Sequence, residues 1–357
     1  MKFCDVVVIG GGPAGMSAAL NAADAGVRVV IMDRNAELGG QLIKQTHKFF
    51  GSEHQHAGTR GIEIVKMLRE QIYSHPRIEV HTETDVLGIY DDRVISYEDH
   101  GVYSRLTAEK IIISTGAQEK MLQFENNDLP GVYGAGAIQT LMNVYGIQPG
   151  SKVLMIGAGN IGLIVTYQLL QAGVDVVAIV EAAPRIGGYK VHASKVRRMG
   201  VPIYTQTTCV AALGEDYVTG AVLADMDDKF QVVEGTEREI EVDTICLAVG
   251  LSPLYELISQ THCKMYYIPQ LGGFVPARDE NLETTAKGVY VAGDVSCIEE
   301  ATAAMIEGSI AGVAAAISTG MNHPEVLAKR EDYIAQLADL RAGKTGAKIR
   351  NGLAMMD

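Results

Sequence analysis

The chain has 357 residues, of which 43 are acidic and 30 are basic, giving a formal net charge of -13 at pH 7. Hydrophobic residues make up 47% of it and charged residues 20%. This balance is typical of a folded chain of about two domains and excludes a disordered or collagen-like one. The excess of acidic residues argues against binding to nucleic acid or to an anionic membrane surface.

The cysteines and the N-terminal segment predict a cytoplasmic protein. The five cysteines include no CxxC pair, which argues against a secreted disulfide framework and a zinc knuckle. The N-terminal segment has the pattern of a buried strand instead of a signal peptide. Apolar stretches fall short of the roughly 18 uncharged residues of a membrane helix, so no membrane insertion is expected. His47, His54 and His56 lack the spacing and companions of a metal site, and we expect no metal.

A strand, a glycine-rich loop and a helix open the chain. An apolar run at 5–9 leads into Gly-Gly-Gly-Pro-Ala-Gly at 10–15, and a helix of small residues is expected to about residue 25. In a GxGxxG loop, the first glycine permits a tight turn, the second lets a pyrophosphate approach, and the third allows the helix to pack on the strand. A second strand ends in Asp33, 18 residues after Gly15, where a carboxylate accepts hydrogen bonds from ribose hydroxyls. These residues predict a dinucleotide site.

The same unit recurs at an offset of 147 residues. A strand at 152–156 leads into Gly-Ala-Gly-Asn-Ile-Gly at 157–162, and the next strand ends in Glu181, 19 residues after Gly162. Asp33 precedes Gly40 by seven residues, as Glu181 precedes Gly188. Each copy closes with another apolar strand and a glycine, Gly116 in the first copy and Gly250 in the second. This duplication predicts two similar nucleotide-binding domains.

A further buried strand at 288–294 needs a sheet to join, and the simplest topology returns it to the first domain. The predicted fold is therefore α/β, with two Rossmann-like three-layer dinucleotide-binding domains, the second inserted in the first. We expect a polar helix near 324–340, with an apolar stripe suited to docking or self-association, and a frayed end from 343. The predicted boundaries are 1–120 and 251–322 for the first domain, 121–250 for the second, and 323–357 for a C-terminal helix and tail. The stripe consists of Val326, Tyr333, Ile334, Leu337 and Leu340.

Over about residues 3–320 the chain resembles flavoproteins with two dinucleotide-binding domains, the pyridine nucleotide-disulfide oxidoreductase group. The resemblance rests on both glycine loops with their acids, Gly39-Gly40-Gln41, the strand end Ser-Thr-Gly-Ala at 114–117, and Val-Ala-Gly-Asp at 291–294. It implies that the first loop and Asp33 bind FAD and that Asp294 binds its ribityl chain or phosphate. It also implies that a helix beginning at Ala301 and Thr302 points its N-terminus at the flavin, where the dipole stabilises negative charge on the reduced ring.

The departures from that group narrow the expected activity. Without a CxxC pair, and without a cysteine in the loop at 39–42, disulfide reductase activity is not expected, and Cys297 is expected to be a packing residue. Segments 129–140 and 145–150 resemble the FAD/NAD-binding subunits of bacterial amine and amino-acid dehydrogenases and oxidases. That group includes hydrogen cyanide synthase B, octopine oxidase A, dye-linked proline dehydrogenase alpha and sarcosine oxidase alpha. The resemblance implies a homo- or hetero-oligomer whose electron partner is a second flavoprotein subunit or a small molecule.

The second site is expected to favour NAD(H) over NADP(H). A carboxylate at Glu181 accepts a hydrogen bond from a free 2'-hydroxyl and repels a 2'-phosphate, although Arg185 could reach such a phosphate. A structural ADP or ATP in this site stays open, because all these ligands share an adenosine diphosphate moiety.

These observations predict an FAD-dependent oxidoreductase that passes hydride between NAD(H) and a partner or small acceptor, as a subunit of an amino-acid or amine dehydrogenase-type complex. Two alternatives are a stand-alone NADH:acceptor reductase and a nucleotide-holding electron-relay subunit without NADH chemistry. Gln41, Lys44 and His47 are expected in the flavin environment. The expected cofactor-binding residues are Gly10, Gly12, Pro13, Ala14, Gly15, Asp33, Arg34, Gly40, Gln41, Thr115, Gly116, Gly157, Gly159, Asn160, Ile161, Gly162, Glu181, Gly250, Gly293, Asp294, Ala301 and Thr302.

Overall fold

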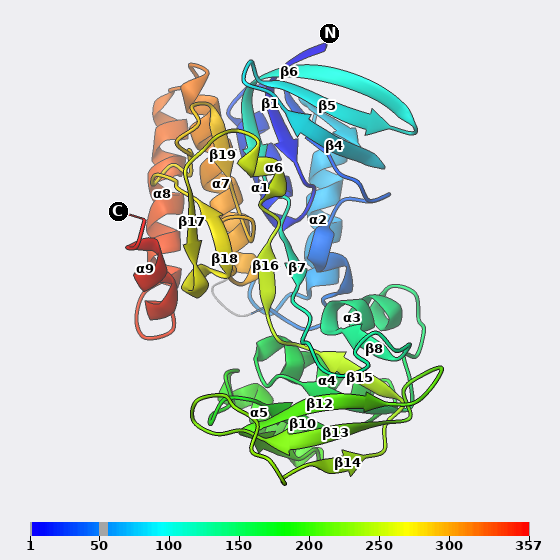
Figure 1. Ribbon diagram of the computed structural model, residues 1–357. Coiled ribbons are helices and arrows are strands. Elements are labelled where there is room, and N and C mark those ends of the chain that lie inside the picture. The colour runs from blue at the N-terminus through cyan, green and yellow to red at the C-terminus, as the bar shows by residue number, and fades with distance from the viewer. Residues whose placement is uncertain (1, 50–55, 357) are drawn as a thin grey trace. The chain divides into compact units, whose positions relative to one another are not determined.

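The computed structural model, which describes residues 2–49 and 56–356, divides the chain into two compact units (Figure 1). Unit 1 comprises Met1–Gln118 and Leu251–Asp357, and unit 2 comprises Glu119–Gly250. The chain leaves unit 1 along β7 (Ala117–Glu119) and returns along β16 (Leu251–Pro253), and these two strands pair with each other. Unit 2 is therefore an insertion in unit 1.

Unit 1 is built on a seven-stranded sheet in the order β3-β2-β1-β6-β5-β4, with β19 also paired to β6. Apolar, β-branched runs form its central strands, which are buried on both faces as parallel strands are. The parallel strands are β1 (Lys2–Ile9), β2 (Val29–Met32), β3 (Ile78–His81), β6 (Val102–Ile113) and β19 (Val289–Val291). The antiparallel strands are β4 (Thr84–Ile89) and β5 (Val94–Asp99).

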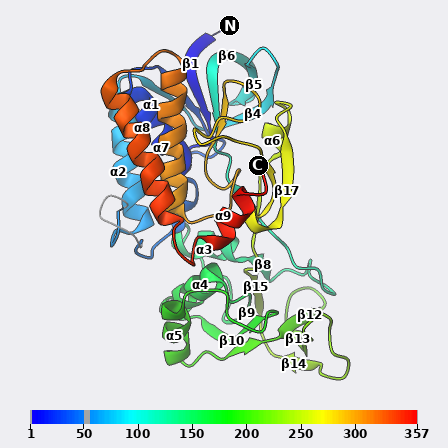
Figure 2. The ribbon, with the colours of Figure 1, turned by 90° about the vertical axis from the view of Figure 1, so that its left-hand side faces the viewer.

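Four helices lie side by side on one face of this sheet (Figure 2): α1 (Pro13–Asp24), α2 (Gly61–Ser74), α7 (Ala301–Ser318) and α8 (Pro324–Leu340). Helix α7 packs directly on α1, because a Cβ at Gly308 or Gly312 would overlap the carbonyl oxygens of Ala14 and Ala18. By length and composition α7 could cross a membrane, but 83% of it is buried, which marks it as a core helix. This packing places the N-terminus of α7 beside the start of α1.

On the opposite face, the segment 255–277 packs in one apolar cluster with residues of the sheet, including those of β4 and β5. That segment contains α6 (Glu256–Ser259), β17 (Met265–Ile268), the short helix η3 (Pro269–Leu271) and β18 (Gly273–Pro276). Unit 1 has another short helix, η1 (Gly40–Lys44), between β2 and α2.

In the C-terminal segment the stripe docks on the unit's own core, and the prediction of a frayed end was wrong. Leu337 is buried, and Tyr333, Ile334 and Leu340 pack against the core that α1 and α7 form. The chain then forms a further helix, α9 (Ala347–Leu353), which packs on η3. An amphipathic pattern predicts an apolar face but not its partner, which here is the unit's own core.

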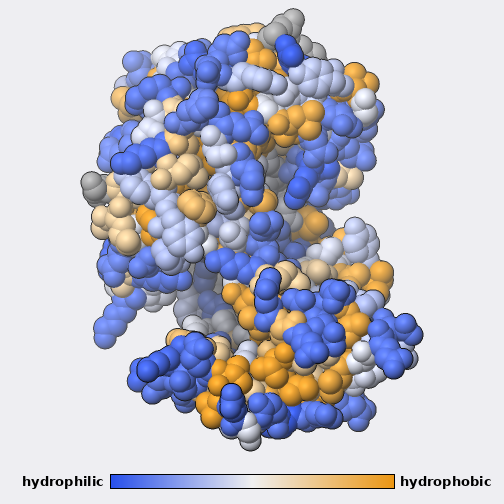
Figure 3. Space-filling model, in the orientation of Figure 1, coloured by the Kyte–Doolittle hydropathy of each residue, from blue (hydrophilic) through white to orange (hydrophobic). Residues whose placement is uncertain are grey.

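Unit 2 repeats the arrangement with a five-stranded parallel sheet in the order β11-β10-β9-β15-β8, accompanied by α3 (Ala135–Asn143), α4 (Asn160–Gln171) and α5 (Lys190–Arg198). A separate antiparallel sheet carries half-buried apolar residues, and orange side chains gather over this part of the unit in Figure 3. The parallel strands are β8 (Val132–Gly134), β9 (Lys152–Ile156), β10 (Asp175–Glu181), β11 (Ile203–Thr205) and β15 (Thr244–Leu247). The antiparallel strands are β12 (Thr207–Leu213), β13 (Gly220–Asp225) and β14 (Arg238–Ile240).

In both units the strand order reverses at the first strand. β1 lies between β2 and β6, and β9 lies between β10 and β15. Ligands of such sheets bind at the carboxyl ends of the strands, where the order reverses. The predicted α/β class with two Rossmann-type units is confirmed, and the carboxyl ends of β1 and β9 are the places to look for sites.

Candidate functional site

The first glycine loop follows β1, and two of its glycines are required by the fold. Gly10 has a φ of +103°, and a Cβ there would overlap the carbonyl oxygen of Ser114. A Cβ at Gly15 would overlap the carbonyl oxygen of Gly10. At Gly12, in contrast, a Cβ would lie 3.9 Å from its nearest neighbour, the Cα of Gly40. The middle glycine therefore serves no packing need and leaves the backbone open to a ligand.

The loop after β9 has the same construction. A Cβ at Gly157 would overlap the carbonyl oxygen of Ala248, and one at Gly162 would overlap that of Gly157. A Cβ at Gly159 would meet no described atom within 4 Å. The two copies thus agree on which glycines the fold needs and which one leaves open space.

Both loops lead into helices whose first N–H groups face outward from the sheet. Helix α1 begins at Pro13 after Gly12, and α4 begins at Asn160 after Gly159. The N-cap residue of each helix is a glycine, which has no side chain to cap the helix. Uncapped N–H groups and the positive end of the helix dipole form a ready site for a phosphate. Proline at the first position of α1 costs nothing, because its missing N–H is one that has no helical partner.

Each predicted acid lies beside its own loop. Asp33 is 6% exposed, and its Oδ2 accepts a 2.6 Å hydrogen bond from the N–H of Gly11. Glu181 accepts a 2.8 Å bond at Oε2 from the N–H of Ala158. Asn35 donates to the other oxygen of Asp33, and Ala183 to that of Glu181. Ionised carboxylate oxygens hold more than one lone pair, so both acids can still accept bonds from ribose hydroxyls.

The paired glycines after β2 lie against the first loop. Gly39 donates a 2.7 Å hydrogen bond to the carbonyl oxygen of Gly11, and a Cβ at Gly40 would lie 2.9 Å from the Cα of Gly12. Gly188, which corresponds to Gly40, makes the same close contact in unit 2, where its Cβ would lie 2.9 Å from the carbonyl carbon of Gly159. The matching spacing in the sequence therefore reflects a matching backbone contact at each loop.

The segment after the first glycine pair holds the predicted flavin-environment residues. Gln41 is exposed, whereas Lys44 and His47 are partly buried. His47 stacks on Phe49, with 5.9 Å between ring centroids. Nearby, the side-chain oxygen of Gln45 is buried without a hydrogen-bond partner among the described residues. Buried acceptors in folded proteins generally receive a hydrogen bond.

The two strand-end glycines close their respective sites. Ser114 donates from its hydroxyl to the carbonyl oxygen of Gly10, and Thr115 donates to that of Leu254. Gly116 follows with a φ of +76°, and Gly250 in unit 2 has a φ of +116°. Arg34, beside Asp33, is exposed.

The Gly-Asp pair at the end of β19 lies near the first loop. A Cβ at Gly293 would lie 3.0 Å from the Cβ of Ala14, in the first turn of α1. Asp294 accepts a 3.3 Å hydrogen bond at Oδ1 from the N–H of Glu299. Burial raises the pKa of Asp294 to about 7, with the hydrogen bond from Glu299 lowering it and the charges of Glu307 and Glu299 raising it. Ala301 and Thr302 form the start of α7 directly after this loop.

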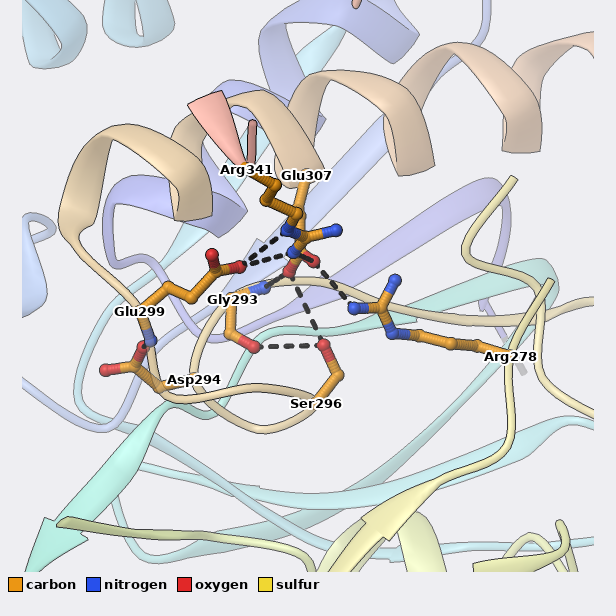
Figure 4. Close-up of polar contacts among 7 residues, drawn as sticks. All are labelled: Arg278, Gly293, Asp294, Ser296, Glu299, Glu307 and Arg341. Atoms are coloured by element: carbon orange, nitrogen blue, oxygen red, sulfur yellow. Dashed lines mark hydrogen bonds and ion pairs between the residues drawn. The ribbon is translucent and has the colours of Figure 1, made fainter. Parts of the chain in front are cut away.

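A buried charge cluster, absent from the sequence prediction, supports the Gly-Asp loop (Figure 4). Glu307, which is 1% exposed, accepts at Oε1 from Arg278 at 2.8 Å and from Arg341 at 2.6 Å. Its Oε2 accepts from the N–H of Gly293 at 2.9 Å. Burial alone would raise the pKa of Glu307, but the two guanidinium groups hold it below its ordinary value. Glu307 is the one charged residue in the sequence of α7, and that isolation was the available signal.

Unit 2 has a carboxylate at the start of α3, which was also absent from the prediction. Glu119 accepts a 2.6 Å hydrogen bond at Oε1 from the N–H of Gly136. A Cβ at Gly134 would overlap the same carboxylate. An acid at this position stabilises the helix through its dipole.

No group of three or more metal-ligating side chains occurs within residues 2–49 and 56–356. His54 lies outside the described residues.

Comparison with known proteins assigns the chain to a family. Residues 4–325 match the family described as Pyridine nucleotide-disulphide oxidoreductase. The alpha chain of sarcosine oxidase from Rhizobium meliloti (strain 1021) is 29% identical over 317 residues, which are 84% of this chain and 30% of that protein. The A chain of opine oxidase from Agrobacterium tumefaciens (strain Ach5) is 28% identical over 337 residues, which are 88% of this chain and 65% of the relative. The HcnB subunit of hydrogen cyanide synthase from Pseudomonas protegens is 24% identical over 355 residues, 94% of this chain and 75% of the relative.

The chain thus spans 30% of the length of the first relative and 65% of the length of the second, and both relatives are named as subunits. Among solved structures, L-proline dehydrogenase from P. horikoshii has a TM-score of 0.71 at 22% identity, covering 94% of this chain and 59% of that one. Thioredoxin reductase from T. acidophilum has a TM-score of 0.72 at 22% identity, covering 89% and 99%. These structures share the two-unit fold. The chain belongs to the pyridine nucleotide-disulphide oxidoreductase family of flavin-dependent oxidoreductases, as its resemblance predicted.

Proposed function

We propose that this chain binds FAD in unit 1 and NADH in unit 2, and that it passes reducing equivalents between NADH and a partner subunit that oxidises an amine or amino acid. FAD, when bound, supplies the hydride and electron chemistry. The chain's own residues bind the nucleotides, orient them and compensate charge. The observation that carries the proposal is the duplicated loop with its acid, each loop keeping its middle glycine open.

Unit 1 fits FAD at five places. The N–H groups at the start of α1 suit the pyrophosphate, and Asp33 beside the loop suits the adenosine ribose. Asp294 provides a third polar group, and Gly293, the residue before it, lies against Ala14 in the first turn of α1. The start of α7 at Ala301 and Thr302 would face the flavin, and its dipole stabilises negative charge on a reduced ring. Gln45 offers a buried acceptor oxygen for the N–H of a bound group.

Unit 2 fits NADH better than NADPH. Glu181 is fixed beside its loop by hydrogen bonds from Ala158 and Ala183, so its negative charge stays at the strand end. That charge accepts a bond from a 2'-hydroxyl and repels a 2'-phosphate. Arg185 lies on the loop that follows and is exposed. We therefore expect the fixed carboxylate of Glu181, and not the solvated Arg185, to set the preference for NADH over NADPH.

Reduction of a disulfide substrate is not part of the proposed function. All five cysteines are buried, and burial raises the pKa values of the Cys4 and Cys209 thiols to about 12. A thiol attacks a disulfide as the thiolate, so a raised pKa suppresses this reaction. The start of α3 lies in the segment 129–140, which has no cysteine, and there Gly136 donates to the carboxylate of Glu119. That helix end is occupied by an acid of the chain itself.

A partner subunit is proposed because the similar relatives are named as subunits of sarcosine oxidase, opine oxidase and hydrogen cyanide synthase. Sarcosine and the opines both contain an amine nitrogen, which is the group that the proposed partner would oxidise. The chain supplies the two nucleotide sites, and we assign oxidation of the amine to the partner.

The test is an anaerobic titration of the purified protein with NADH and, separately, with NADPH, followed by the flavin absorbance at about 450 nm. The proposed function requires that the flavin band bleaches stoichiometrically with NADH and at much higher concentrations with NADPH. If neither nucleotide bleaches the flavin while dithionite still reduces it, the proposed function is wrong and the nucleotide-holding relay subunit replaces it. Rapid turnover of a quinone or dye without a partner would favour the stand-alone reductase.

A further inference from the structure

Arg341 comes from the C-terminal segment but ends in the charge cluster beneath the Gly-Asp loop. It follows the last residue of α8, and the whole residue is 8% exposed. Its guanidinium donates to Glu299 from Nε at 2.9 Å and from Nη2, and Nη2 also donates to Glu307 (Figure 4). One arginine therefore joins two carboxylates that lie on either side of a loop.

The two glutamates flank Asp294, Glu307 through its carboxylate and Glu299 through its backbone. On one side, Glu307 accepts from the N–H of Gly293 at 2.9 Å, and it also accepts from the hydroxyl of Ser296. On the other side, the backbone N–H of Glu299 donates to Asp294 itself. Arg341 is thus in direct contact with both glutamates that flank this loop. Asp294 has no ion-pair partner among the described residues, so its orientation depends on this loop.

The charges of the cluster balance only when Arg341 is present. Arg278 and Arg341 oppose Glu299 and Glu307, and all four side chains are 13% exposed or less. Buried carboxylates without a matching cation are costly, so loss of one guanidinium would repel the carboxylates from one another and from Asp294. The loop would then move, or one of the carboxylates would take up a proton.

The C-terminal helix holds Arg341 in place. Arg350 of α9 donates to the carbonyl oxygens of Arg341 and Gly343. Ile349 of α9 belongs to the same apolar cluster as Cys297, which lies within the loop. The tail is therefore tied to the Gly-Asp loop by ion pairs on one side and by apolar contact on the other.

We propose that Arg341 is a positioning residue for the flavin half of FAD, because it fixes the 293–299 loop so that Asp294 is presented to the ribityl chain. This inference rests on the proposed FAD site in unit 1. It assigns a cofactor-binding role to the C-terminal segment, which lies beyond the residues matched to the family. The adenosine half of FAD, at the first glycine loop and Asp33, should be insensitive to Arg341.

The test compares Arg341→Gln with Arg330→Gln in the full-length protein. Arg330 lies on the same helix and forms ion pairs with Glu280 and Glu331, away from the loop, so it is the matched control. FAD and ADP are titrated separately into each apoprotein by calorimetry, with saturating NAD⁺ present to fill the proposed site of unit 2, so that ADP reports the adenosine half of the FAD site. Loss of a charge-assisted contact predicts FAD binding weaker by about tenfold or more in Arg341→Gln. ADP affinity and stoichiometry should match wild type, Arg330→Gln should bind both normally, and Arg341→Lys should recover part of the FAD affinity.

Three results would overturn the assignment, and they are distinguishable. Wild-type FAD affinity in Arg341→Gln would show that the arginine does not position the loop. Equal losses of FAD and ADP affinity would show general damage to unit 1 instead. Wild-type apoprotein that binds no FAD would refute the proposed function itself, and the assignment with it. If Arg341→Gln does not fold, Glu299→Gln replaces it, because that variant breaks one arm of the contact and leaves Arg341 paired to Glu307.

Discussion

The carboxylate of Glu181 accepts a 2.8 Å hydrogen bond from the N–H of Ala158, and Asp33 accepts the equivalent 2.6 Å bond from the N–H of Gly11. In both units the donor is the residue between the first two glycines of the loop. The acid at the end of the second strand is therefore locked to the loop that would carry the pyrophosphate. Because the same hydrogen bond occurs in both units, we expect each acid to bind the ribose of its own nucleotide in the same way.

Exchanging each acid for its amide should separate the two sites. Glu181→Gln should weaken NADH binding by about tenfold, since one acceptor oxygen becomes a donor, and should narrow the gap between NADH and NADPH. FAD content should stay at the wild-type level. Asp33→Asn should do the reverse, with weaker FAD and unchanged NADH affinity. The measurements are nucleotide titrations followed by fluorescence and flavin-to-protein ratios.

The exposed Glu215 of unit 2 provides the control for these variants. Glu215→Gln removes one negative charge without touching either loop, so it should leave both affinities unchanged. If Glu181→Gln released FAD or if Glu215→Gln altered the nucleotide preference, long-range charge and not the strand-end carboxylate would set the specificity.

The middle and last glycines of the second loop should respond differently to alanine. A Cβ at Gly159 meets no described atom within 4 Å, so Gly159→Ala should unfold at the wild-type temperature but bind NADH poorly, because the methyl group occupies the approach of the pyrophosphate. A Cβ at Gly162 overlaps the carbonyl oxygen of Gly157, so Gly162→Ala should be destabilised by about 1–3 kcal/mol. Thermal unfolding and NADH titration of the same samples check both effects. Normal NADH affinity in a folded Gly159→Ala protein would contradict the loop assignment.

The glycine loops and their acids were predictable because their chemistry is local. Each loop and its helix span a few residues, and the acid follows at a fixed spacing, so Asp33 and Glu181 could be found without knowing the rest of the fold. The duplication predicted two similar domains, and the structure shows the same reversal of strand order at β1 and at β9.

The charge cluster and the C-terminal contacts were not predictable in this way. Glu307 is 34 residues from Arg341 and 29 from Arg278, and nothing in their local sequence indicates the pairing. The stripe on α8 predicted an apolar face, but only packing shows that Leu337 lies in the unit's own core. Interactions between distant segments depend on how helices dock, which periodicity does not record.

Asp294 should make the apoprotein less stable as the pH rises. Its pKa is raised from 3.8 to about 7, so the folded protein holds a proton that the unfolded chain has lost between those values. Stability therefore falls as the pH rises through this window and levels off above it. Glu299, Glu307, Arg278 and Arg341 all face this region, and the two guanidinium groups hold the pKa of Glu307 below its ordinary value. Asp294→Asn should melt at a higher temperature than wild type at pH 8, by a margin that shrinks toward pH 4.

The same substitution should weaken FAD binding, since Asn offers one acceptor oxygen and no charge. Melting curves of both apoproteins across the pH range, with Asp339→Asn on the exposed side of α8 as control, measure the first effect. FAD titration measures the second. A margin independent of pH would show that Asp294 does not titrate in the window, and equal FAD affinity would remove it from the flavin site.

The buried thiols give the last prediction. Burial raises the pKa values of all five cysteines. For Cys297, in the Gly-Asp loop, the nearby charges of Glu299 and Glu307 raise the pKa as well. A disulfide reagent such as dithiobis(nitrobenzoic acid) at pH 8 should therefore react slowly with the folded protein and with five thiols once it is denatured. Cys297→Ala should still be reduced by NADH at the wild-type rate. NADH-dependent turnover of the reagent that disappears in Cys297→Ala would instead make this cysteine part of a thiol relay, and the amine-oxidising assignment would have to yield to disulfide chemistry.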